Sequence, residues 1–230
     1  MAISAAGSSA REEVLRRIRV ALGGSRTALE AINSEWAGLD RSYKRAGELS
    51  HDAVLEQLED RLRDYDAHVE RAISGDLKRK IAELLSARGV RTLVVPEGLA
   101  NAIGAELPEG FEFAIDERLD AAELDKLQGV VTGCTVAISQ TGTLVLQNVP
   151  GQGRRAPTLV PDYHLCIVRE SDVVETVPEA MACLEPTALL ATTFISGPSA
   201  TADIEMTRVK GVHGPRFLDV ILVRSGADTV

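Results

Sequence analysis

Residues Asp76–Pro96, DLKRKIAELLSARGVRTLVVP, predict a helix followed by a strand. Ile81 and Leu84 fall on one helical face, and Gly89 provides the residue type that most readily ends a helix in the left-handed conformation. The apolar run Val90–Val95 then predicts a buried strand, which the following proline ends. Alternation of helix and strand at this spacing is typical of α/β proteins.

Further apolar stretches toward the carboxyl end extend this pattern. The first two of them are separated by Gln140-Thr141-Gly142, which is short enough for a β-hairpin. We therefore expect a sheet that is mixed, with mostly parallel strands. The predicted strands are 130–139, 143–146, 164–169, 191–195 and 217–223, and the clearest predicted helix is 173–184.

Residues 1–75 differ from the rest of the chain because they contain no proline and are rich in alanine and charged residues. Ser9–Glu12 matches a capping box, and the apolar periodicity after it predicts a first helix. A second helix is predicted over Ser50–Gly75. Because two amphipathic helices are not stable alone, we interpret 1–75 as a helical arm and 76–230 as the α/β domain.

Composition excludes several classes of protein. The chain has 230 residues, 45% of them hydrophobic, and a formal net charge of −9. Nucleic-acid binding needs a basic surface, which this acidic chain does not predict. No apolar run approaches the roughly 20 residues of a membrane span, and the first residues lack the pattern of a signal peptide, so we expect a cytoplasmic protein without membrane insertion.

The three cysteines, Cys134, Cys166 and Cys183, are far apart and form no CxxC pair. Free thiols of this kind are typical of a reducing compartment. An iron–sulfur cluster usually takes four thiolates, so we expect no cofactor in this chain. Asp162, His164 and Cys166 alternate along a predicted strand and could hold a metal, but nothing else completes such a site, and we predict none.

A glycine-rich turn, Gly151-Gln152-Gly153-Arg154-Arg155, follows one of the predicted strands. Its GxGxxA pattern resembles a dinucleotide-binding motif, but the prolines that follow leave no room for the required helix. One interpretation is a backbone nest at Gly151 and Gly153, with Arg154 and Arg155 holding a carboxylate or phosphate. The alternative is a solvated loop with no function.

The densest group of polar residues is Ser196–Glu205, which follows the predicted strand 191–195. Loops at strand ends often bind ligands in α/β proteins. Alternatively, Ser199 or Thr201 caps a helix whose first turn contains Asp203 and Glu205. Nearby, His213 stands between Gly211 and Pro215, where it could carry a proton or only close a turn.

Five motifs in this order resemble the lactate-utilization protein C family, whose domain is called LUD. They are Thr141–Leu146, Gly151–Arg155, Leu159–His164, Ser196–Glu205 and Gly211–Pro215. The resemblance implies a three-layer α/β/α sandwich with a mixed, mostly parallel sheet, similar to ribose-5-phosphate isomerase, glucosamine-6-phosphate deaminase and CoA transferases. It also implies a role in oxidising L-lactate to pyruvate with two separate iron–sulfur subunits. Gln140 departs from the family, which has an acidic residue there.

Our first hypothesis is a non-redox subunit of a lactate-oxidising system that binds a small anionic metabolite. The proposed ligand-binding residues are Thr141, Gly142, Thr143, Gly151, Gly153, Arg154, Arg155, Gly197, Ser199 and Thr201, and the proposed catalytic residues are His213, Asp203 and Glu205. A second hypothesis is an assembly module that docks on the iron–sulfur subunits through the helical arm. A third, by fold analogy alone, is a stand-alone sugar-phosphate isomerase or CoA-transferase-like enzyme.

Overall fold

The computed structural model describes residues 5–22, 29–201, 209–211 and 214–225. It divides the chain into two compact units, 1–43 and 44–230. The described helices of the first unit are α1 (Ala5–Ala21) and α2 (Leu29–Ala37). Both expose apolar side chains, including Ile18 and Trp36, which are 48% and 68% exposed. The first unit therefore presents uncovered apolar surface.

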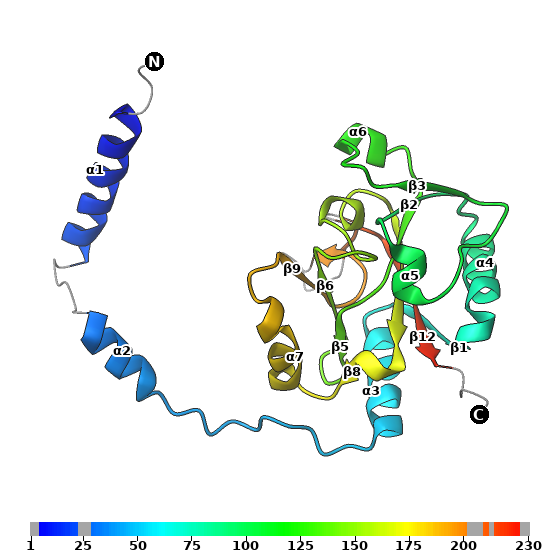
Figure 1. The fold of residues 1–230 in the computed structure, drawn as a ribbon, viewed down its shortest axis with the longest axis horizontal. Helices are drawn as coiled ribbons and strands as arrows, with labels where there is room; N and C mark the ends of the chain where they lie inside the picture. Colours follow the sequence, from blue (N-terminus) through cyan, green and yellow to red (C-terminus); the bar gives the residue numbers. More distant parts are fainter. Residues whose placement is uncertain (1–4, 23–28, 202–208, 212–213, 226–230) are drawn as a thin grey trace. The chain divides into compact units, whose positions relative to one another are not determined.

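The second unit is built around a six-stranded sheet in which all neighbouring strands run parallel (Figure 1). Its order is β1-β12-β7-β4-β2-β3. Parallel sheets are buried on both faces. This explains why six of the seven residues of the inner strand β7 are buried and its last residue, Arg169, is the exposed one. The strands are β1 His68–Ile73, β2 Thr92–Val95, β3 Glu112–Ile115, β4 Gly129–Thr132, β7 Tyr163–Arg169 and β12 Phe217–Arg224.

A separate four-stranded sheet contains the antiparallel pairs. Its order is β8-β5-β6-β9, and β5 and β6 form the hairpin predicted at residues 140–142. The strands are β5 Val136–Ile138, β6 Thr143–Gln147, β8 Val173–Val174 and β9 Thr192–Ile195. A short two-stranded ribbon joins β10 (Ala200–Thr201) to β11 (Val209–Lys210).

Helices cover both faces of the six-stranded sheet. One face packs against α4 (Leu77–Arg88) and α5 (Leu99–Ile103). The other packs against α3 (His51–Asp64) and the inner face of the four-stranded sheet. The outer face of that second sheet packs against α7 (Val177–Leu184). The predicted α/β class, with a mostly parallel sheet flanked by helices, is confirmed.

The remaining elements are α6 Ala121–Leu124, η1 Ser74–Asp76, η2 Ala156–Thr158, η3 Glu170–Asp172 and η4 Glu185–Thr187.

Two predicted elements are divided in the structure. The strand expected at 130–139 is broken after β4, because Gly133 donates its backbone N–H to the carbonyl of Gly151 and the chain then enters the other sheet. The helix expected at 173–184 begins only at Val177, after the short strand β8. Local apolar patterns do not show which sheet a strand joins.

The expected arm also differs from the structure, which divides the chain after Tyr43 and not at residue 75. The helix predicted to reach Gly75 ends at Asp64, and Asp66 then takes a left-handed conformation with φ of 67°. The following residues form β1, which pairs along β12. Val69 fits a helical period as well as a strand, but the segment around it gains backbone hydrogen bonds to β12.

The linker that leads into α3 is tied to the start of α7. The backbone N–H of Gly47 donates to the Glu179 carboxylate at 3.1 Å, and those of Glu48 and Leu49 donate to the Glu175 carboxylate at 2.6 and 2.7 Å. A Cβ on Gly47 would lie only 2.2 Å from Glu175 Oε2. Only glycine therefore allows the linker to approach this closely.

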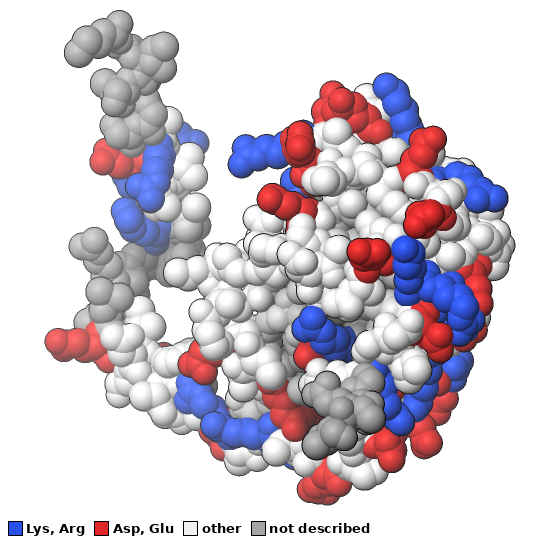
Figure 2. All heavy atoms as spheres, turned by 45° about the vertical axis from the view of Figure 1, so that its right-hand side comes forward, with Lys and Arg blue, Asp and Glu red and all other residues white. Residues whose placement is uncertain are grey.

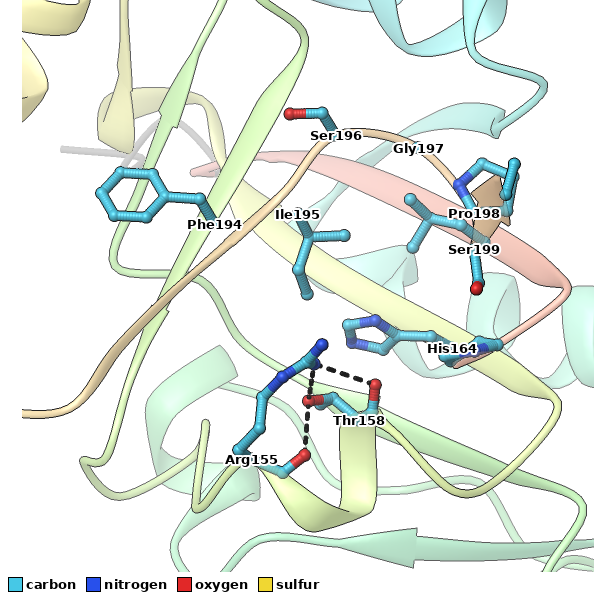
Figure 3. Close-up of a pocket in the computed structure, with 12 residues that line it drawn as sticks. Arg155, Thr158, His164, Phe194, Ile195, Ser196, Gly197, Pro198 and Ser199 are labelled. Atoms are coloured by element: carbon cyan, nitrogen blue, oxygen red, sulfur yellow. Dashed lines mark hydrogen bonds between the residues drawn. The ribbon is translucent and has the colours of Figure 1, made fainter. Parts of the chain in front are cut away.

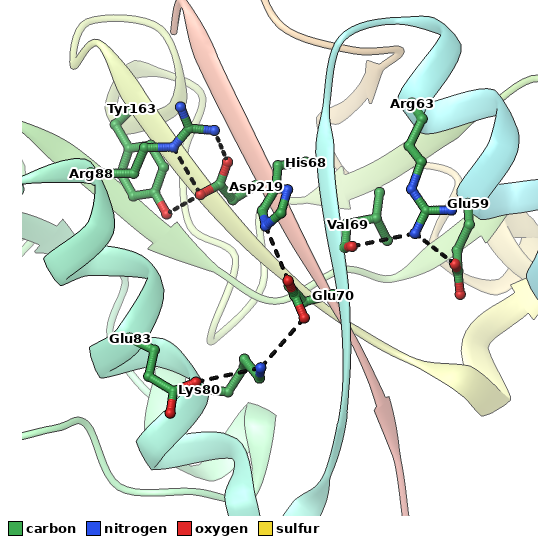
Figure 4. Close-up of polar contacts among 10 residues, drawn as sticks. All are labelled: Glu59, Arg63, His68, Val69, Glu70, Lys80, Glu83, Arg88, Tyr163 and Asp219. Atoms are coloured by element: carbon green, nitrogen blue, oxygen red, sulfur yellow. Dashed lines mark hydrogen bonds and ion pairs between the residues drawn. The ribbon is translucent and has the colours of Figure 1, made fainter.

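Asp219 places a buried carboxylate in the middle of the fold (Figure 4). Arg88, the last residue of α4, donates to both of its oxygens, and the hydroxyl of Tyr163 donates at 3.0 Å. Burial and the neighbouring carboxylate raise the pKa of Tyr163, so its hydroxyl remains a donor. This network fastens α4 to the neighbouring strands β7 and β12.

We expect Arg88→Met to lower the free energy of unfolding by about 3–5 kcal/mol, because it leaves the buried carboxylate of Asp219 without its cation. Urea unfolding measures the change. The control is Arg79→Met, which removes an exposed ion pair to Glu83 on the same helix and should change little. A loss for Arg88→Met no larger than for the control would show that the buried pair is not stabilising.

Candidate functional site

A polar cavity of about 270 Å³ lies in the second unit (Figure 3). Its floor is formed by His164 and Leu218, from the amino-terminal halves of β7 and β12, and its roof by residues 194–200, which begin in β9. Arg155 and Thr158 close one side. The cavity therefore lies at the carboxyl end of β9 in the four-stranded sheet. In the parallel sheet it lies near the amino ends of β7 and β12.

Arg155 gives this cavity a positive charge. Its Nη1 donates to the carbonyl and hydroxyl oxygens of Thr158 at 3.1 and 2.9 Å, which fixes the guanidinium beside His164. Burial lowers the pKa of Arg155, but the ordinary pKa of arginine is so high that the group remains charged at neutral pH. The remaining N–H groups of this fork can bind a carboxylate or phosphate.

His164 supplies a neutral imidazole to the same cavity. Its Nε2 lies 2.8 Å from the hydroxyl oxygen of Thr132, and the residue is 1% exposed. Burial, with a smaller contribution from the charge of Arg155, lowers the pKa of His164 to about 3. At neutral pH the ring can therefore donate or accept a hydrogen bond, but it does not carry a positive charge.

From the sequence, His164 was considered for a role only as a metal ligand, and neither Thr132 nor Thr158 was predicted as a site residue. A usable signal was present, because Thr132 and His164 are polar residues within otherwise apolar strands. The three side chains considered for a metal do not converge: Asp162 pairs with Arg216, and the Cys166 thiol lies 3.7 Å from the carbonyl of Gly133. Across the described ranges, no three His, Cys, Asp or Glu residues are grouped to hold a metal ion.

Arg154 points elsewhere. Its Nε and Nη2 donate to the two carboxylate oxygens of Asp116, each at 2.7 Å, and Nη2 also donates to the carbonyl of Leu119. The nearby carboxylate of Asp116 raises the pKa of Arg154. This arginine joins the end of β3 to the glycine-rich turn. It does not line the 270 Å³ cavity, although it lines a smaller cavity together with Arg155.

The glycine-rich turn does not present the nest of amides that its sequence suggested. Gly151 donates its N–H to the carbonyl of Glu97 at 2.7 Å, and Gln152 and Gly153 donate to the carbonyl of Val149 at 3.1 and 2.9 Å. These three donors are therefore used within the fold. The turn positions the two arginines that follow it.

The Thr141–Thr143 segment supports the cavity from outside. The hydroxyls of Thr141 and Thr143 lie 2.8 Å apart, and Thr143 lies 2.8 Å from the hydroxyl of Ser196, which lines the cavity. This chain of hydroxyls ties the hairpin to the roof. Gln140 donates its backbone N–H to the carbonyl of Glu175.

Two of the proposed ligand-binding glycines pack against the end of α3. A Cβ on Gly142 would lie 2.8 Å from Cβ of Arg61, and one on Gly197 would lie 2.5 Å from Cβ of Tyr65. Both glycines also have positive φ angles, 59° and 81°, which other residues rarely adopt. The close approach of backbone to helix explains both glycines without a ligand.

Ser199 lines the cavity together with Arg155 and Gly197, so the structure brings these three predicted residues together. Its backbone N–H donates to the carbonyl of Pro215 at 2.8 Å. Thr201 is the last residue of β10. The three proposed catalytic residues, Asp203, Glu205 and His213, lie outside the described residues.

The face of the molecule seen in Figure 2 carries acidic and basic side chains interspersed, without a continuous basic stripe. Nucleic-acid binding would require such a stripe. None of the described helices is long and apolar enough to cross a lipid bilayer.

Fold and cavity together define a class: an α/β protein with a parallel central sheet and a polar cavity lined by a partly exposed arginine and a buried, neutral histidine. The LUD domain family model matches residues 55–223. The chain belongs to this LUD domain family.

Individual relatives agree with this assignment. "Lactate utilization protein C" of Deinococcus radiodurans is 40% identical over 219 residues, which cover 94% of this chain and 96% of the relative. A protein with the same description from Halalkalibacterium halodurans is 28% identical and covers 89% and 94% of the two chains. The crystal structure of a DUF162 family protein from Deinococcus radiodurans matches with a TM-score of 0.66 and 37% identity, over 76% of this chain and 99% of that one.

We expect stability to fall below pH 6.5 because of His164. A histidine whose pKa is lower in the folded state binds more protons when unfolded, so its contribution is complete above the unfolded pKa and is lost as the pH falls toward 3. The free energy of unfolding should decrease by about 2 kcal/mol between pH 7 and pH 5.

His164→Gln should remove this decrease, since glutamine keeps a hydrogen-bonding group near Thr132 but does not titrate. Urea unfolding at a series of pH values measures it, with the exposed His51→Gln as control. If the wild type and His164→Gln lose stability in parallel, the buried imidazole is not the source.

Proposed function

We propose that this chain serves lactate utilization by binding a small carboxylate, lactate or pyruvate, in the Arg155 cavity. The descriptions of its relatives support the pathway. An anionic ligand is supported by the position of Arg155. Its guanidinium faces a polar cavity and is held there by neutral oxygens of Thr158. An arginine held in this way retains its full charge for an anion.

The size and lining of the cavity support a small ligand. Drug-sized ligands occupy pockets of about 300–1,000 Å³, and the Arg155 cavity has about 270 Å³. A carboxylate bound to Arg155 would place its neighbouring carbon near His164. The neutral ring can then hydrogen-bond a hydroxyl or a carbonyl oxygen, which is the group that distinguishes lactate from pyruvate.

Oxidation of lactate to pyruvate releases two electrons, which need an acceptor. This chain has three cysteines, one fewer than the four thiolates that an iron–sulfur cluster usually takes. The resemblance to the lactate-utilization protein C family implies separate iron–sulfur subunits, and we place the electron acceptor there. In this proposal the chain is a cytoplasmic, non-redox subunit that presents the substrate.

Arg155→Met should weaken binding of lactate and pyruvate by about 10- to 100-fold, because a hydrogen bond to a charged group contributes about 1.5–3 kcal/mol. Isothermal titration calorimetry with each acid measures the effect. The matched control is Arg118→Met, which removes the same charge at an exposed position outside the cavity. The proposed ligand class is wrong if wild type binds neither acid, or if both variants bind as wild type does.

The exposed apolar residues of α1 and α2 favour a second function, docking on the iron–sulfur subunits. The predicted arm extends to residue 75 and so includes Leu58, but Leu58 is completely buried beneath the six-stranded sheet, and we therefore restrict the docking surface to the first unit, 1–43. Burying large apolar side chains such as Ile18 and Trp36 would supply the binding energy.

Ile18→Glu with Trp36→Glu should abolish co-purification with the iron–sulfur subunits, because a charge cannot be buried in an apolar interface without a partner. Affinity purification from cells that express all subunits tests this. Arg17→Glu changes a residue of the same helix with a 75% exposed side chain and serves as control. Recovery of the intact complex with the double variant would exclude docking through these helices.

A further inference from the structure

In the part of the chain that the structure describes, four strands lie at the edges of the two larger sheets, and three of them are protected against pairing with another chain. β1 contains Glu70 and Arg71, and β3 contains Glu112 and is followed by Asp116. β8 is only two residues long. Charges and short length are the usual means by which proteins prevent edge strands from pairing.

The fourth edge strand, β9, has neither protection (Figure 1). It lies within a seventeen-residue run, 186–202, that contains no charged residue in a chain with 26% charged residues. Phe194 in the strand is 50% exposed, and Leu189 just before it is fully exposed. An uncharged edge with exposed apolar side chains is a template for strand addition.

We propose that β9 pairs with β9 of a second copy of this chain, antiparallel and around a two-fold axis. Charge argues for this occupant. Two copies of a chain with net charge −9 repel one another, and they can approach closely where neither contributes a charge. A charged partner strand would bury its charges opposite β9 with nothing to pair them.

The side chains of β9 suit pairing with themselves. An axis through Thr193 would place each Thr192 opposite the Phe194 of the other copy, on the same face of the sheet, and pairs of aromatic and β-branched residues stabilise antiparallel strands. Phe194 pairs with Val145 of β6, whose side chain packs beneath α7, so its ring lies on the outer face of the sheet. Two-fold dimers with one self-complementary surface are the commonest oligomers.

The pairing would also place the second copy beside the Arg155 cavity. Phe194 and Ile195 both contribute to its lining, and in Figure 3 the Phe194 ring points away from Arg155 and His164. Ile195 therefore faces the cavity and Phe194 lies on the outer face of the sheet, while the edge of β9 that does not pair with β6 would meet the partner. This inference does not depend on which ligand the cavity binds.

Sedimentation equilibrium of the full chain at micromolar concentrations tests the proposal, with an expected mass of twice 24.6 kDa. Phe194→Lys and, separately, Leu189→Glu should raise the dissociation constant of the dimer at least about tenfold. The matched control is Ile115→Lys on the edge strand β3, where the isoleucine is 53% exposed, and it should leave the dimer unchanged.

A monomeric wild type at these concentrations would overturn the proposal. So would a dimer that Ile18→Glu with Trp36→Glu dissociates while both β9 variants leave it intact, because the helices of the first unit would then form the interface. Hydrogen exchange gives an independent measurement: amides of 192–195 should exchange more slowly as protein concentration rises, and those of 112–115 should not.

Discussion

The fold depends on covering both faces of a parallel sheet. The side chains on one face of β7 and β12 repeat at every second residue, and toward the carboxyl ends of these strands Cys166, Val168, Val220 and Leu222 are buried beneath α3 and the second sheet. Toward the amino ends, the same face presents His164 to the cavity. The cavity is thus the part of a buried face that the covering elements leave open, which explains why a polar side chain is found in an otherwise apolar strand.

Much of the fold follows from local patterns. The helix ending at Gly89, the hairpin between β5 and β6 and the strands 164–169 and 217–223 were predicted because helical period, turn residues and apolar runs are local properties. The sheet that each strand joins is not local. β1 illustrates this, because its six residues continue a helical pattern and become a strand only through pairing with β12, about 150 residues later in the chain.

The site was predictable only in part, for the same reason. The sequence pointed to Arg155 and Ser199, which line one cavity, but it also grouped Arg154 with Arg155 because they are adjacent. Their different environments come from Asp116, 38 positions before Arg154 in the chain, which binds one arginine and not the other. The amide of Gly151 is likewise used by a distant carbonyl, that of Glu97. The charge of a side chain can be read from the sequence, whereas its partner cannot.

α3 connects two regions that the chain keeps far apart. Its first turn follows the linker that Glu175 and Glu179 hold, and its last residues contact the glycines of the hairpin and of the cavity roof without space for a single methyl group. A helix of 14 residues is a stiff rod about 21 Å long. A displacement of the linker would therefore move α3 as a unit and, with it, the glycines at the rim of the cavity.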